Sequence, residues 1–262
     1  MKNDSFILLI VLLSILFFLG ATCGTKPPPP PPPPPEIPTS VTDIDNNTYQ
    51  VKRFNNTLWM TENLRVTRYD TESTCYDEVI QEVANNQRVD MNNPYYNNAK
   101  DFIDPPYTDN LTREIRNRLG VLYNWSAATG AVDNNASVND YIQGICPNGW
   151  RLPNTKDWDS LCTLLGGKKI AGEKLKAQYG WYSVSGSNES GMECYPAGLA
   201  AGNYISFVGR QIMFWCPKGL MLDKSKAEVT RIYFDKDEVE LGLLISKIQA
   251  NSVRCVKDII DY

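Results

Sequence analysis

The sequence predicts an α+β fold with a small sheet, one or two short helices, long irregular loops and disulfide bonds. Short runs of alternating residues, such as 48–54 and 58–60, are separated by Asn-Asn pairs. Asparagine tolerates the left-handed backbone region and suits hairpin turns, so these runs indicate strands. A single segment, residues 154–165, carries apolar residues at helical spacing. Few helices among many short strands favour the α+β class.

The strands begin with residues 41–69, which we interpret as a β-meander. Further strands and turns are expected at residues 191–198, 204–208, 210–216, 228–234 and 252–256. The last of these is short, β-branched and close to the C-terminus, so it should pair inside the sheet and hold the chain end in place. Residues 121–128 form an apolar, aromatic block that is expected to enter the core.

The helix at residues 154–165 has signals at both ends. Asn154 is placed to cap it, and Asp157 stands at the third helical position, which is a variant of the capping box. The pair Gly166 and Gly167 should end it. Its apolar stripe, spaced i, i+3, i+4 and i+7, consists of Trp158, Leu161, Cys162 and Leu165.

Residues 70–120 are polar, rich in asparagine and interrupted by prolines, and we interpret them as a long surface loop region. A short helix within residues 110–120 is expected to end at Gly120. Loops of this length in compact domains tend to be functional or mobile. The loop region and residues 181–193 are therefore the segments in which we expect a ligand site.

The first 22 residues have the pattern of a signal peptide. Lys2 precedes an apolar run of about 14 residues, whereas a bilayer-spanning helix needs roughly 20. Small residues before Cys23 are typical of a lipoprotein signal, although Thr22 departs from the usual residue at that position. We expect lipidation at Cys23, with a plain secretory signal or an uncleaved anchor as the alternatives. The expected location is the cell envelope, as an outer-membrane lipoprotein whose face is undetermined.

Residues 23–40 would then form a stalk, because residues 27–35 are all proline. Such a run adopts polyproline II at about 3.1 Å per residue, or roughly 28 Å in total. The alternative is a ligand for a proline-recognition domain. Residues 41–262 remain for the folded domain, a length that fits one large or two small domains; we treat it as one.

Composition excludes several function classes. The net charge is −4 and the isoelectric point is about 5.1, so we expect no nucleic-acid partner. The chain contains no histidine, which removes the usual catalytic base and the commonest metal ligand. We expect no cofactor and no metal site. Asp43 and Asp45 are better explained by a turn than by a calcium loop, because further spaced oxygen ligands are missing.

There are seven cysteines. If Cys23 carries lipid, six remain in an oxidising compartment, where they permit three disulfides and 15 connectivities. No pair has the C-x-x-C spacing of a zinc ribbon or a thioredoxin-type site. The six are Cys75, Cys146, Cys162, Cys194, Cys216 and Cys255.

Several blocks together resemble one family, the Fibrobacter succinogenes major paralogous domain of exported proteins in the Fibrobacter and Bacteroidetes lineages. The resemblance extends over residues 41–258. The blocks are VTDID at 41–45, WMTENL at 59–64, LYNW at 122–125, CPNGWRLP at 146–153, DW at 157–158 with Leu161, PAG at 196–198, FW at 214–215 and SVRCVKD at 252–258.

The resemblance implies a mixed α+β fold, similar to C-type lectins and formylglycine-generating enzymes, and no established activity. It also implies a disulfide between Cys146 and Cys255. We pair Cys194 with Cys216 and Cys75 with Cys162 as further hypotheses. The calcium and sugar ligands of C-type lectins and the copper-holding cysteines of formylglycine-generating enzymes have no counterpart in this chain.

The function we expect is a non-catalytic binding or adhesion module, anchored in the membrane by its lipid and directed at a glycan or a protein. One alternative is a structural envelope or assembly subunit. The other is a hydrolase with paired carboxylates, either Asp101 and Asp104 or Asp235 and Asp237. Five tryptophans lie in the family blocks and should be core residues, which leaves Trp181 as the least certain of the six.

Overall fold

The computed structural model describes residues 37–70, 81–82, 94–98, 113–130, 141–183, 185–202, 204–219 and 222–259. Pro38–Tyr262 form one compact unit. Within the described residues, no helix has both the length and the apolar character needed to cross a bilayer. The predicted signal peptide, Cys23 and the proline run lie outside the described residues, and so do Cys75, Asp101 and Asp104.

The first sheet has four antiparallel strands in the order β1-β2-β3-β13. They are β1 (Ser40–Thr42), β2 (Thr48–Phe54), β3 (Thr57–Met60) and β13 (Val256–Asp258). In the two turns, Asn46 and Asn55 have φ values of 65° and 51°, the left-handed region that asparagine enters more readily than most residues. The predicted β-meander is confirmed, and β13 holds the C-terminal segment against β3.

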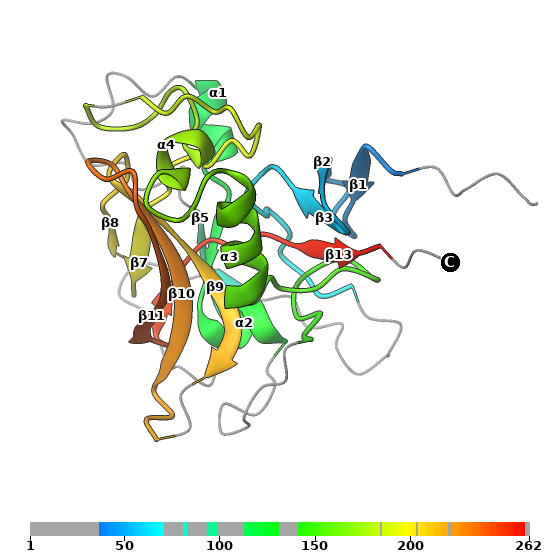
Figure 1. The fold of residues 1–262 in the computed structure, drawn as a ribbon. Helices are drawn as coiled ribbons and strands as arrows, with labels where there is room; N and C mark the ends of the chain where they lie inside the picture. The colour runs from blue at the N-terminus through cyan, green and yellow to red at the C-terminus, as the bar shows by residue number, and fades with distance from the viewer. Residues whose placement is uncertain are drawn as a thin grey trace, which may run out of the picture. The chain divides into compact units, whose positions relative to one another are not determined.

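The second sheet contains the longest strands, in the order β11-β10-β9. They are β9 (Gln211–Gly219), β10 (Lys226–Tyr233) and β11 (Val239–Ser246), all antiparallel. The helix α3 (Thr155–Leu164) packs on this sheet (Figure 1). The ring centroid of Trp158, on α3, lies 4.7 Å from that of Trp59 and 4.9 Å from that of Phe214. One aromatic side chain therefore joins the two sheets.

The helix α3 forms as its sequence predicts. Asn154 accepts hydrogen bonds from the backbone nitrogens of residues 156 and 157, and the Asp157 carboxylate accepts one from the backbone nitrogen of Asn154 at 2.7 Å. This reciprocal pair is a complete capping box. Gly166 and Gly167, with φ values of 100° and 103°, end the helix. Trp158, Leu161 and Cys162 are buried, and Leu165 is partly buried against the same cluster.

The described residues also form two smaller sheets, in the orders β12-β7-β8 and β4-β5-β6. Their strands are β4 (Gln81–Glu82), β5 (Tyr95–Asn98), β6 (Val121–Tyr123), β7 (Leu199–Ala201), β8 (Tyr204–Ser206) and β12 (Gln249–Ala250). The remaining helices are α1 (Arg113–Arg118), α2 (Trp125–Thr129) and α4 (Ala171–Leu175). β5 corrects the interpretation of residues 70–120 as a surface loop, because Tyr95, Tyr96 and Asn97 are buried and the strand pairs with β6.

Residues 191–198 do not form the predicted strand; Cys194 makes only an isolated bridge with Lys176. The reason is the backbone of Gly191, Glu193 and Gly198, whose φ values of 70°, 45° and 73° interrupt any extended run. The C-terminal strand is also shifted from the predicted residues 252–256 to Val256–Asp258. The final segment is nevertheless held in place, since β13 pairs with β3.

The five tryptophans of the family blocks are core residues, as expected, with exposed fractions of 0 to 4% for Trp59, Trp125, Trp150, Trp158 and Trp215. Trp181, the least certain of the six, is also buried, at 9% exposed, and belongs to the same core cluster as Trp59 and Trp158. Trp125 and Trp215 meet edge to face, with ring centroids 5.4 Å apart. The predicted apolar block at residues 121–128 also lies in the core, where it forms β6 and most of α2.

The cysteines confirm one bridge and correct two hypotheses. Cys146 and Cys255 are joined, as the family resemblance implies. Cys194 and Cys216 are both free, so the bridge proposed between them is wrong. Cys162 is also free and buried, and its proposed partner Cys75 lies outside the described residues. Cys216 is instead 3.6 Å from the hydroxyl of Thr230, inside the sheet.

Candidate functional site

Two cavities adjoin α1, and both are lined by Glu114 and Arg118. The larger, here called the aromatic cavity, has a volume of about 680 Å³. The smaller, called the amide cavity, has a volume of about 480 Å³. The aromatic cavity is further lined by Ile115, Gln178, Tyr179, Gly180, Trp181, Ser185, Asn188, Glu193 and Tyr195. The amide cavity is further lined by Asn47, Glu62, Arg65, Asn98, Arg116, Asn117, Gly120 and Val121.

The position of α1 is set by Gly120 just beyond its end. Gly120 has a φ of 77°, and a Cβ atom there would lie 2.6 Å from the Cβ of Asn63 and 2.9 Å from the carbonyl oxygen of Leu64. Only glycine permits this approach without strain. The side chain of Asn63 also donates to the carbonyl oxygen of Leu119 at 2.9 Å. The helix is therefore fixed against residues 62–65, which form the far side of the amide cavity.

The buried side chain of Arg254 connects both cavities to the core. Its Nε donates to Oδ1 of Asn63 at 3.0 Å, and Nη1 donates to the carbonyl oxygens of Met60 at 3.1 Å and Met192 at 2.8 Å. Nη2 donates to the carbonyl oxygen of Glu193 at 3.0 Å. One guanidinium thus positions two groups. It holds Asn63, which in turn holds the end of α1, and it holds the backbone of Glu193 on the opposite wall. Burial lowers the pKa of Arg254 below its ordinary value.

The second wall of the aromatic cavity is residues 178–195. Nε1 of Trp181 donates to the carbonyl oxygen of Cys194 at 3.1 Å, which fixes the indole. The backbone nitrogen of Glu193 donates to Oδ1 of Asn188 at 3.0 Å. Glu193 has a φ of 45°, which is uncommon for a residue with a side chain and costs on the order of 1–3 kcal/mol. Asn188 and Arg254 together hold this strained residue with its carboxylate towards α1.

Arg118 stands between the walls and touches groups from both. Nη1 pairs with the carboxylate of Glu193, and Nη2 lies 3.6 Å from the carboxylate of Glu114. The guanidinium also lies 5.9 Å from the ring centroid of Tyr195. Burial alone would lower the pKa of Arg118, but the negative charge of Glu193 and its neighbours raises it above its ordinary value. Arg118 is therefore a permanent cation shared by the two cavities.

The aromatic side chains of the larger cavity differ in exposure. Tyr179 is 68% exposed, whereas Trp181 is 9% exposed. Behind the indole, Nζ of the buried Lys176 lies 5.6 Å from the Trp181 ring centroid. The same ammonium donates to the carbonyl oxygens of Phe234 at 3.0 Å and Lys236 at 2.8 Å. Trp181 is thus a rigid ring at the cavity wall, and Tyr179 is an exposed ring at its opening.

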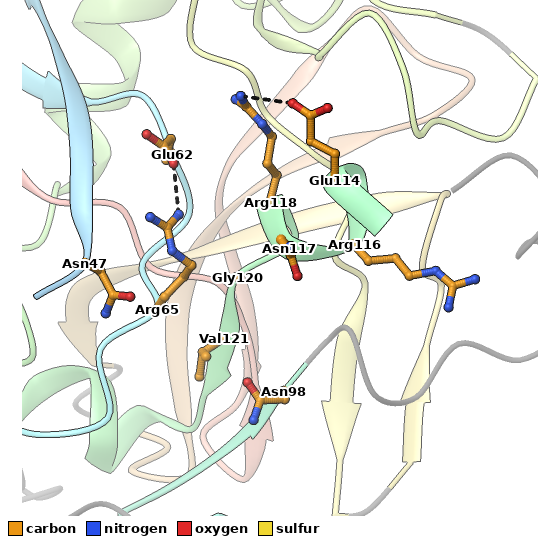
Figure 2. A pocket seen from close by; sticks show the side chains of 10 residues that line it. All are labelled: Asn47, Glu62, Arg65, Asn98, Glu114, Arg116, Asn117, Arg118, Gly120 and Val121. Carbon is orange, nitrogen blue, oxygen red and sulfur yellow. Dashed lines mark hydrogen bonds and ion pairs between the residues drawn. The ribbon is translucent and has the colours of Figure 1, made fainter. Parts of the chain in front are cut away.

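The amide cavity is polar throughout most of its lining (Figure 2). The side-chain nitrogen of Asn47 donates to the Asp43 carboxylate and lies 3.2 and 2.9 Å from its two oxygens. The amide oxygen is the acceptor of this side chain. Arg65 pairs with Glu62 at 2.9 Å and also donates to the Thr48 carbonyl oxygen at 3.1 Å. Figure 2 shows Arg116 pointing away from the other labelled side chains.

The remaining sequence-predicted candidates lie elsewhere. Asp43 accepts hydrogen bonds from the backbone nitrogens of Asp45 and Asn47, both at 2.9 Å, so the predicted turn is confirmed. Asp235 and Asp237 lie on an exposed turn after β10 and do not line either cavity. Among the described residues, no group of three potential metal ligands is brought together.

Sequence reasoning placed the ligand site in residues 70–120 and 181–193, and the aromatic cavity draws on both segments. It did not identify the residues that build the cavity. The hydrogen bonds of Arg118 and Arg254 join segments that are between 61 and 194 residues apart. The available signal was Arg254 itself, a charged residue inside an otherwise apolar strand-like segment, because such a residue needs several buried acceptors.

Fold and site together define a disulfide-closed α+β domain with two adjoining cavities beside its short helix α1. The aromatic cavity and the amide cavity are together called the cleft. The family model described as Fibrobacter succinogenes major domain matches residues 53–257, so the chain belongs to this family. None of the curated proteins matches the chain, and none of the solved structures does.

Proposed function

We propose that this domain is a non-catalytic binding module and that its aromatic cavity takes one sugar unit of a glycan. The observation that carries the proposal is the arrangement of Tyr179, Trp181 and Tyr195 beside Arg118 and Glu193 in one cavity of about 680 Å³. A pyranose ring has an apolar C–H face, which packs on aromatic rings, and hydroxyl groups around its edge. Planar amide, carboxylate and guanidinium groups match such hydroxyls as donors and acceptors.

The state of the two carboxylates supports binding rather than hydrolysis. Glycoside hydrolysis needs one protonated carboxylic acid and a second carboxylate that attacks or activates water. Glu114 and Glu193 are both paired with the single guanidinium of Arg118. An arginine held between two carboxylates positions them as hydrogen-bond acceptors. A hydrolase would require one of them to leave this pair and carry a proton.

The membrane attachment is part of the same proposal. It is supported by the apolar segment before Cys23, the small residues that precede this cysteine and the nine prolines that follow. A lipid at Cys23 would anchor the chain in the envelope, and the stalk would separate the domain from the headgroups. We also propose a C-type-lectin-like arrangement, which is supported by the Cys146–Cys255 bridge and by the irregular segments around the cleft. Mass spectrometry of the native N-terminus tests the anchor: a diacylglyceryl Cys23 is expected, and an unmodified or uncleaved terminus contradicts it.

A glycan array probed with the full chain in detergent tests the binding function. We expect a defined set of glycans to bind, and Tyr179→Ala to weaken that binding at least about tenfold, which corresponds to 1.4 kcal/mol. Tyr204→Ala is the matched control, because Tyr204 is 74% exposed and lies on β8 away from both cavities. Equal loss in both variants, or a blank array, would contradict the proposal. A blank array from a chain that self-associates would favour the assembly subunit, and release of shortened oligosaccharides would favour the hydrolase.

A further inference from the structure

The two cavities are close enough to serve one ligand, because they share two side chains. Glu114 and Arg118 line both of them. The Arg118–Glu114 pair therefore forms the divide between the aromatic cavity and the amide cavity. In Figure 2 the pair lies at one side of the amide cavity, with Asn117 beside it and Asn98 and Asn47 across the opening. A ligand that crosses this pair meets both cavities in succession.

The chemistry of the amide cavity is that of hydroxyl recognition. It contains the amides of Asn47, Asn98 and Asn117 and the ion pair of Arg65 with Glu62. Asn47 is held in one orientation by Asp43, so its acceptor oxygen is preorganised. Amides and ion pairs present donors and acceptors side by side, as vicinal hydroxyls require. Val121 is the apolar side chain in the lining, and the aromatic rings of the neighbouring cavity have no counterpart here.

The charges of the amide cavity favour a neutral ligand. Its lining holds two glutamates, Glu62 and Glu114, and three arginines, Arg65, Arg116 and Arg118. Arg65 and Arg118 are each paired with a carboxylate, and Figure 2 shows Arg116 directed away from the other labelled side chains. An anionic group that bound Arg65 or Arg118 would have to displace one of these carboxylates and then remain close to it, which costs Coulomb energy. A neutral hydroxyl group can bond to the outer edges of both partners without breaking the pair.

On these observations we propose that the two cavities are adjoining subsites for a single neutral oligosaccharide. One sugar unit packs on the rings of the aromatic cavity, the chain crosses the Arg118–Glu114 pair, and a following unit hydrogen-bonds to the amides. This inference rests on the proposed glycan binding and adds two properties to it: the ligand is uncharged, and it is longer than one unit.

The test is a calorimetric titration of the full chain in detergent with oligosaccharide ladders of one to six units. The neutral ladders are built of glucose, mannose, galactose or xylose, and an anionic ladder is built of galacturonic acid. We expect one neutral ladder to gain at least about tenfold in affinity between one unit and three. The galacturonic acid ladder should bind more weakly than the neutral ladder.

Two variants separate the subsites. Asn117→Ala should lower the affinity for the longer members about three- to tenfold and leave the affinity for the single unit unchanged. Tyr179→Ala should weaken every member of the ladder. The matched controls are Asn56→Ala, an exposed asparagine on the turn between β2 and β3, and Tyr204→Ala.

The outcomes distinguish this inference from the function on which it rests. If sugars bind and Tyr179→Ala weakens them, but affinity does not depend on length or Asn117→Ala behaves like Asn56→Ala, the two-subsite inference fails and glycan binding stands. A preference for the galacturonic acid ladder overturns the neutral class alone. If no ladder binds, both proposals are overturned.

Discussion

Two buried arginines show how differently the two sides of this domain are stabilised. Arg151 is 6% exposed and bonds to the carboxylates of Asp157 and Asp258, with distances of 2.6 to 3.0 Å. Arg254 is 0% exposed, and its hydrogen-bond partners in the described part of the chain are carbonyl and amide oxygens. Burial alone would lower the pKa of both, but the two carboxylates raise the pKa of Arg151 above its ordinary value.

The difference separates two regions of the domain. The first is the frame of regular elements around Arg151, and the second is the cleft, meaning the two cavities beside α1, whose walls Arg254 supports. Arg151 joins the start of α3, through Asp157, to β13, through Asp258, so it connects two regular elements. Arg254 joins the end of β3, through Met60, and Asn63 beyond it to residues 192–193. Strand ends and irregular segments leave backbone oxygens outside the regular hydrogen-bond pattern, and these need another donor when they are buried. A guanidinium with five donors is suited to hold such segments together, and these segments carry the cleft.

The largest loss of stability is expected for Cys146→Ser. This substitution releases Cys255, which lies between Arg254 and the start of β13. The bridge has a sequence separation of 109, and in the chain-entropy model its loss costs about 4–5 kcal/mol. Urea unfolding under non-reducing conditions measures this as a fall in the free energy of unfolding. A loss below about 1 kcal/mol would show that the bridge is dispensable to both arginine networks.

Arg254→Met is expected to cost about 3–5 kcal/mol, because three buried acceptors and one partly buried acceptor lose a charged donor. It should also abolish ligand binding, since Asn63 and Glu193 lose a common support. Arg254→Lys keeps the charge but loses the planar fork, so it should retain part of the stability and little of the binding. Normal binding by a folded Arg254→Met protein would refute the role of this residue in the cleft.

Arg151→Met is the matched comparison and should cost about 2 kcal/mol, because Asp258 is half exposed and water replaces part of the interaction. Ligand affinity should be unchanged, since neither cavity is lined by Arg151 or by its two partners. Urea unfolding and calorimetric titration on the same sample check both statements. Equal binding losses for Arg151→Met and Arg254→Met would remove the distinction between the frame and the cleft.

A smaller effect concerns the three free thiols of the described residues. Burial raises the pKa of Cys162 and Cys216 to about 12 and that of Cys194 to about 11, although the nearby Arg254 lowers the last. An unfolded thiol releases its proton near pH 9, so the unfolded chain deprotonates first. The stability contributed by these neutral thiols is therefore complete below pH 9 and is lost as the pH rises towards 11–12.

Urea unfolding between pH 8 and 11 measures this loss. A variant with alanine at positions 162, 194 and 216 should lose less stability over the range than the wild-type chain. Buried tyrosines contribute equally to both curves, so the difference between them isolates the thiols. Parallel curves would contradict the assignment of these cysteines as buried free thiols.

The sequence predicted the frame well because its signals are local. The capping box at Asn154, the asparagine turns at Asn46 and Asn55 and the glycine after α1 each depend on neighbouring residues. β11 was missed because Leu241, Gly242, Leu243 and Leu244 lack an alternating pattern. The strand assigned to residues 191–198 was wrong because a positive φ at Glu193 cannot be read from its residue type. It is imposed by Asn188 and by Arg254, which is 61 residues away.

The cleft could be located in outline but not in detail, for a related reason. Asparagine-rich and irregular segments indicated where a ligand site would lie. The pairing of Arg118 with Glu193, at a separation of 75 residues, depends on the close approach at Gly120 and on the Arg254 network. Such contacts between distant segments have no signature in a single sequence.

The most direct test of the account is a fluorine NMR titration of the full chain labelled with 5-fluorotryptophan, using the oligosaccharide that binds. Trp181 lines the aromatic cavity, and the other five tryptophans are at most 4% exposed in the core. The resonance assigned by Trp181→Phe should shift with ligand concentration while the other five stay in place. Saturable binding that leaves the Trp181 resonance unmoved would contradict the placement of the ligand in this cleft.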